Sequence, residues 1–125
     1  MPIIRHHQLR DIETPGGNTG AALATPSRGA TQVSVIRQRQ QPGGANPLHT
    51  HDREEVLVML AGEITIMLDG EAHAIAAGDT VIIPPRTPHH LANTGAATAE
   101  WLLIAPAGVR FTHADGAEGS PPWAQ

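Results

Sequence analysis

The chain contains no cysteine, no lysine and no tyrosine among its 125 residues. The absence of cysteine excludes a disulfide framework, a thiol nucleophile and any zinc or iron–sulfur site held by cysteine. Without lysine and tyrosine there can be no Schiff-base lysine, no lysine base and no tyrosine acid or radical. Catalysis would have to come from histidine, aspartate, glutamate, arginine, serine, threonine or a bound metal.

The sequence also lacks a basic face, a signal peptide and a long apolar run. Its eight basic residues, all arginines, are scattered, and the net charge is −4, which argues against nucleic acid as a partner. Segment 1–11 has no apolar signal region, and no apolar run approaches membrane length. We therefore expect no nucleic-acid partner, no membrane partner and a cytoplasmic location.

Turn-forming residues are abundant, with 13 glycines and 11 prolines. Valine, isoleucine and threonine recur in short runs, and no long stretch has helical spacing. These features predict an all-β fold of seven or eight short strands, a sandwich or a small barrel. Strands are expected within 31–40, 48–60, 63–75, 80–83, 89–95 and 98–106.

Segment 63–75 gives the clearest hairpin signal. Asp69–Gly70 suits a two-residue type I′ turn, in which both central residues need positive φ. That turn fixes the register, so that Ile66 faces His73 across the two strands.

We expect one domain with three parts. Residues 1–30 form an irregular arm with at most one edge strand, residues 31–106 form the barrel, and residues 107–125 form a tail. Trp123 in this tail is expected to pack on the barrel or on a second protomer.

Histidines and acidic residues are concentrated in HTHDREE, residues 49–55. In an extended strand His49, His51 and Glu55 would share one face and Glu54 the other. Two imidazoles and a carboxylate suit a divalent transition metal such as Fe, Mn, Co, Ni, Cu or Zn. His89, which follows a proline-rich loop, is the natural candidate for a fourth ligand.

The spacing around HTHDREE resembles the first motif of the cupin superfamily. Five residues separate Gly43 from His49, three separate His51 from Glu55, and six separate Glu55 from Gly62.

A second stretch resembles the second cupin motif. Gly78 is followed after five residues by Pro84, and His89 is followed after three residues by Asn93. One position departs from the family, because Arg86 stands where cupins usually have glycine. This departure concerns the turn, since the spacing to His89 is kept.

The resemblance implies a small cupin β-barrel, or double-stranded jelly roll, and four metal ligands at His49, His51, Glu55 and His89. It also implies a small-molecule ligand or substrate and a homodimer. A metal-dependent, dioxygenase-like oxidoreductase is favoured, with Glu55 serving as ligand and as catalytic base. The alternatives are a non-catalytic metabolite binder or sensor and a metal-dependent isomerase or lyase.

Four further residues are candidates for substrate binding. Arg37 and Arg39 share a face of the strand before the first motif, where one could pair with a substrate carboxylate. Arg86 lies beside the loop to His89, and His73 could reach the pocket from the hairpin. The alternatives are a solvated strand end for the first two, a surface turn for Arg86 and cross-strand packing for His73.

Overall fold

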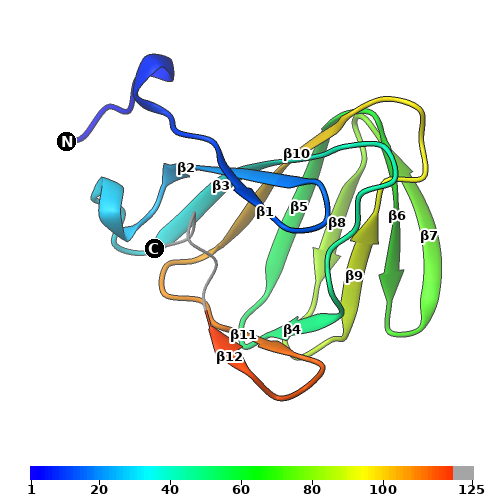
Figure 1. The fold of residues 1–125 in the computed structure, drawn as a ribbon. Coiled ribbons are helices and arrows are strands. Elements are labelled where there is room, and N and C mark those ends of the chain that lie inside the picture. Colours follow the sequence, from blue (N-terminus) through cyan, green and yellow to red (C-terminus); the bar gives the residue numbers. More distant parts are fainter. Residues whose placement is uncertain (120–125) are drawn as a thin grey trace.

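The computed structural model describes residues 1–119. Two antiparallel sheets of six strands each form a jelly-roll barrel (Figure 1). Sheet A has the order β1 (Ile12–Thr14), β2 (Asn18–Ala24), β3 (Val33–Gln40), β10 (Ala99–Pro106), β5 (Glu55–Ala61) and β8 (Thr80–Ile83). Sheet B has the order β12 (Glu118–Gly119), β11 (Phe111–His113), β4 (His49–His51), β9 (His89–Ala92), β6 (Glu63–Leu68) and β7 (Glu71–Ala76). The helices of the described residues are two single 3₁₀ turns, η1 (His6–Gln8) and η2 (Pro26–Arg28).

The β6–β7 hairpin has the register expected from its turn. Ile66 pairs with His73, and both central turn residues have positive φ, 50° at Asp69 and 84° at Gly70. Local turn chemistry therefore determines this part of the fold.

The N-terminal segment contains more sheet than its sequence suggests. We expected an irregular arm with at most one edge strand, but β1 and β2 both extend sheet A, and β2 pairs with β3 along its length. Strand β2 reads NTGAALA and carries no large β-branched or aromatic side chain, so its strand signal is weak. Ala21 is nevertheless fully buried.

The segment after β10 also returns to the barrel. Strand β11 pairs with β4, and the short β12 pairs with β11, although this part of the sequence shows little periodicity. Trp123 lies outside the described residues.

The core fills the space between the two sheets. Alternate side chains of the strands point inward, which gives burial patterns such as that of β5, where every second residue from Glu55 to Met59 is buried. The main cluster comprises Leu57, Met59, Ile64, Ile66, Ile75, Ile83, Leu91, Ala99 and Trp101. No helix among residues 1–119 has the length and apolar character needed to cross a membrane.

Candidate metal centre

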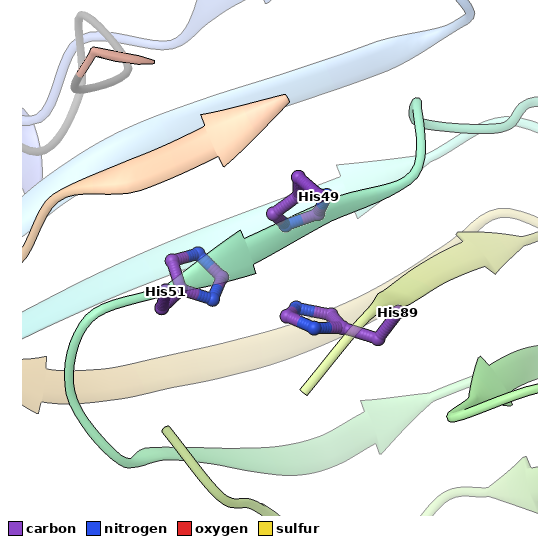
Figure 2. A group of neighbouring side chains, drawn as sticks. All are labelled: His49, His51 and His89. Carbon is purple, nitrogen blue, oxygen red and sulfur yellow. The ribbon is translucent and has the colours of Figure 1, made fainter. Parts of the chain in front are cut away.

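Three histidines on two neighbouring strands point toward one another (Figure 2). His49 and His51 come from β4, and His89 comes from the neighbouring β9, where it pairs directly with His49. Their ring centroids lie 4.3–4.9 Å apart, and one ring nitrogen from each lies within 4.8 Å of the others. This spacing would allow one ion to contact all three rings.

Glu55 reaches the histidines from the opposite sheet. The strand expected over 48–60 is broken at 52–54, and the chain crosses there from β4 in sheet B to β5 in sheet A. Glu55 is 2% exposed, whereas Glu54 is exposed to solvent. Glu55 therefore faces the histidines and Glu54 faces solvent, as expected. The cause is the crossing between sheets rather than the parity of one continuous strand.

The carboxylate of Glu55 faces two of the three rings. Its Oε1 lies 2.9 Å from His51 Nδ1 and 3.9 Å from His89 Nε2. Despite the short distance, His51 Nδ1 and Glu55 Oε1 have no partner in hydrogen-bond geometry, and both are buried. A buried polar atom without a partner costs about 1–3 kcal/mol, so these two atoms point to something that would bind between them.

The backbone fixes the tautomers of the other two histidines. Nδ1 of His49 lies 2.7 Å from the carbonyl oxygen of Pro47, and Nδ1 of His89 lies 2.8 Å from that of Thr87. A carbonyl can only accept, so each Nδ1 carries the proton and donates it. Each Nε2 is then left with a lone pair, which is the state that a metal-binding imidazole needs.

Burial removes charge from the whole cluster. It lowers the pKa of His49, His51 and His89 to about 4, with repulsion from the other histidines adding to the effect at His49 and His89. Burial also raises the pKa of Glu55 to about 8. Near pH 7, with no cation bound, all four groups are therefore uncharged.

The four groups fit a divalent transition metal. Three neutral imidazoles and one carboxylate form the nitrogen and oxygen donor set that such ions prefer. A cation would give the orphaned His51 Nδ1 and Glu55 Oε1 a partner and would favour ionisation of the carboxyl group.

The cluster forms part of the wall of a cavity of about 440 Å³. Most of the cavity wall is apolar, and Trp101, expected in the core, belongs both to the core and to this wall. A small molecule in the cavity would contact the histidines directly.

The residues of the cavity wall that sequence reasoning missed include two aromatic ones beside the histidines, Phe111 and His113. Phe111 pairs with His51 across β11 and β4, and its ring centroid lies 5.9 Å from those of His49 and His51. His113 pairs with His49 and lies 5.2 Å from the Phe111 ring. The alternation of Phe111 and His113 was the available signal, but nothing in the sequence shows which strand they join.

Of the two strand arginines, only Arg39 lines the cavity. Its Nε donates to Glu100 Oε2 at 2.7 Å, and its guanidinium also contacts Asp11 at 3.4 Å. Arg37 pairs with Asp11 at 3.2 Å and is absent from the cavity wall. The structure therefore brings Arg39 but not Arg37 to the cavity, and the guanidinium of Arg39 is already paired with two carboxylates.

Arg86 and His73 lie away from the cavity. Arg86 is exposed, has a φ of 60°, and donates its backbone N–H to the carbonyl of His51 at 2.7 Å. The turn conformation usual for glycine is thus kept by arginine. His73 has a half-exposed side chain 3.7 Å from Glu71, so the structure does not bring either residue together with the histidines.

Comparison with known families agrees with this geometry. Residues 36–105 match the model of the cupin domain. The chain is a cupin. The match covers both motifs, including all four residues of the candidate metal centre.

Several curated proteins are related to this cupin over most of its length. It is 31% identical over 119 residues to auxin-binding protein 1 of Arabidopsis thaliana, covering 83% of the chain and 59% of that protein. It is 41% identical over 100 residues to an uncharacterized protein of Methanocaldococcus jannaschii, covering 76% and 79%. Oxalate oxidase 2 of Hordeum vulgare is 28% identical over 105 residues, covering 74% and 47%. The cupin thus spans about half the length of the plant relatives.

Solved structures share the fold. The polyketide cyclase RemF from Streptomyces resistomycificus superimposes with a TM-score of 0.77 at 23% identity, over 87% of this chain and 81% of that one. An oxalate oxidase superimposes with a TM-score of 0.68 at 27% identity, over 78% and 56%. The first likeness concerns the fold alone.

Proposed function

We propose that this cupin binds one divalent transition metal ion through His49, His51, Glu55 and His89, and that it is a dioxygenase-like oxidoreductase acting on a small organic molecule. The observation that carries the proposal is the convergence of three neutral imidazoles and a buried carboxylate in the wall of a cavity. Similarity to oxalate oxidase and, over 48 residues at 44% identity, to quercetin 2,3-dioxygenase of Bacillus subtilis supports oxygen chemistry.

The protein groups would have separate tasks at such a centre. The ion would supply Lewis-acid or redox chemistry, and four protein ligands would leave room on a five- or six-coordinate ion for further ligands. The carbonyls of Pro47 and Thr87 hold two of the imidazoles in place. Glu55 would serve as ligand and as base, and the apolar wall would limit the access of water.

One observation favours a second candidate function, a non-catalytic binder of a small metabolite. Auxin-binding protein 1, which by its name binds a small molecule, is related over 83% of this chain. Oxygen uptake by the iron or manganese form, with a panel of catechols, diketones and hydroxy acids, separates the two. Uptake with any of them supports an oxygenase or oxidase, and silence across the panel favours the binder.

The metal assignment itself is tested with a matched pair of neighbouring glutamates. We expect purified protein to contain close to one transition metal ion per chain, as measured by elemental analysis. Glu55→Gln should lower the metal affinity at least about tenfold, because loss of a group that only orients a ligand already costs about 10- to 100-fold, whereas Glu54→Gln should leave it unchanged. Equal metal content in the two variants would contradict the assignment.

A homodimer stays a prediction. Val33 and Ile82 are apolar and more than half exposed on sheet A, at 53% and 61%, so burial against a second copy would remove apolar surface from water. Light scattering on the purified protein gives its mass in solution directly.

A further inference from the structure

The cavity next to the three histidines is large and mainly apolar. Its volume is about 440 Å³. Pockets of this size enclose ring-sized organic ligands, and a two-carbon acid would leave most of the wall uncovered. The apolar side chains come from both sheets and include Ile36, Leu57, Ile83, Leu91, Trp101 and Leu103.

The cavity offers no unpaired permanent positive charge within residues 1–119. The chain has no lysine, and Arg39 is the one arginine in the wall. Its guanidinium is bound by Glu100 at 2.7 Å and by Asp11 at 3.4 Å. A carboxylate or phosphate away from the histidines would have to be desolvated without a free cation to pair with, which is costly.

Two neutral amides supply polar contacts in the wall. Gln38 Oε1 accepts the indole N–H of Trp101 at 2.7 Å, and Asn46 Oδ1 accepts the backbone N–H of Leu91 at 2.6 Å. The indole N–H and the backbone N–H can only donate, so they fix which amide atom of each side chain is the oxygen. The amide NH₂ groups of Gln38 and Asn46 can then donate to a carbonyl or hydroxyl oxygen of a ligand.

We infer that the ligand of this cavity is an uncharged, ring-containing molecule with a carbonyl or hydroxyl oxygen bound by the amide of Gln38, and that the wall away from the histidines does not bind a small dianion such as oxalate. The inference deepens the proposed function, because it concerns the same cavity. It rests on that proposal for the view that the cavity is a ligand site. The class of ligand follows from the volume of the cavity, its apolar wall and its neutral amide donors.

A matched set of three probes tests the ligand class on metal-free protein, by calorimetry. 1-Tetralone is a fused-ring ketone, tetralin has the same rings without the oxygen, and oxalate is a small dianion. We expect 1-tetralone to bind about fivefold more tightly than tetralin, the equivalent of one net hydrogen bond, and oxalate not to bind. Equal binding of tetralone and tetralin, or binding of oxalate alone, would overturn the inference.

Variants of Gln38 test the polar contact. Gln38→Glu keeps an oxygen for the Trp101 N–H and replaces the donor by a second acceptor. The preference for 1-tetralone over tetralin should therefore disappear. Gln41→Glu makes the same change of charge in an exposed loop and should leave the preference at about fivefold. Loss of the preference in both variants, or in neither, would contradict the role of Gln38.

A second pair tests the location. Leu103→Phe fills the cavity from β10 and should weaken binding of 1-tetralone at least tenfold. Leu102→Phe, on the adjacent position of the same strand, is absent from the cavity wall and should not weaken it. Unchanged binding in Leu103→Phe would place the ligand elsewhere.

Metal content measured on the protein as purified, before the metal is removed for the probe tests, separates the two proposals. Protein that binds 1-tetralone as expected but holds no metal would contradict the proposed function only. Protein that holds metal at the three histidines but fails the probe test would contradict only the ligand class.

Discussion

Arg86 adopts a left-handed backbone conformation that glycine accepts more readily. Its φ is 60°, at the position where cupins usually have glycine. For a residue with a side chain this conformation costs about 1–2 kcal/mol. It is kept because the backbone N–H of Arg86 donates to the carbonyl of His51 at 2.7 Å, which ties the loop before His89 to β4.

We expect Arg86→Gly to raise the free energy of unfolding by about 1 kcal/mol, because glycine removes the steric cost but adds some freedom to the unfolded chain. Urea unfolding of the two proteins measures the difference. Arg53→Gly is the control, since Arg53 is also exposed but does not have positive φ, and it should lower stability slightly. A loss of stability in both variants would show that Arg86 is not strained.

The carboxyl group of Glu55 should lose its proton when a metal ion binds. Burial raises its pKa to about 8 and lowers the pKa of the three histidines to about 4. At pH 6.5 the carboxyl group is therefore protonated and the histidines are neutral. Binding of a metal ion requires an ionised carboxylate, so it should release about one proton per ion.

Calorimetric metal titrations in buffers of different ionisation enthalpy measure the number of protons released per ion bound. Glu55→Gln has no proton to release and should give a value near zero at the same pH, whereas Glu54→Gln should behave like the wild type. Release of two or more protons by the wild type would mean that the histidines are charged before the metal binds.

At the scale of elements, two glycines of the cupin motifs should differ in what they tolerate. Both have positive φ, 75° at Gly62 and 95° at Gly78. A Cβ on Gly62 would lie 2.9 Å from Ala99 Cα and from the carbonyl oxygen of Thr98, both of them backbone atoms, whereas a Cβ on Gly78 would meet nothing within 4 Å. The first glycine is needed for space as well as for conformation.

Thermal or urea unfolding of two alanine variants checks this difference. Gly78→Ala should cost about 1 kcal/mol for the left-handed conformation alone. Gly62→Ala should cost about 3 kcal/mol or more, because the β5–β6 turn must also move away from β10. Equal losses would mean that the turn at Gly62 shifts without resistance.

Several of these elements could be predicted from the sequence alone. The β6–β7 register followed from Asp69–Gly70, because a turn is chosen by adjacent residues. Strand β8 was predicted at its observed bounds, since an apolar run there is bracketed by turn residues. The proposed ligand residues followed from motif spacing. The sheet crossing at 52–54 was not foreseen, because it depends on which sheet each strand joins.

The parts that were missed depend on pairing between distant segments. Strand β2 is built from small residues, and its place is set by pairing with β3. Phe111 and His113 reach the cavity only because β11 pairs with β4, about 60 residues earlier in the chain. A single sequence does not show which distant segments pair as strands, because that pairing depends on the packing of the whole barrel.

The metal-free protein as a whole should be most stable near pH 6.5. Each histidine has a pKa of about 4 when folded and about 6.5 when unfolded. Between these values the unfolded state binds more protons, so stability is lost as the pH falls. Glu55 acts in the opposite direction. Its folded pKa of about 8 exceeds its unfolded value, so stability is lost as the pH rises from about 4.5 to 8.

Three histidines outweigh one glutamate below pH 6.5. Above it the last protons of the unfolded histidines offset part of the loss caused by the glutamate. The free energy of unfolding should therefore rise by roughly 4 kcal/mol from pH 4.5 to 6.5 and fall by roughly 0.5 kcal/mol from pH 6.5 to 8. Urea unfolding of chelator-treated protein across this range measures both limbs. Glu55→Gln should remove the loss above pH 6.5 and keep the rise below it, and Glu54→Gln should keep both. A profile that is flat below pH 6.5 would show that the histidines are not held neutral by burial, and the four groups would then not form a preformed, uncharged site for a cation.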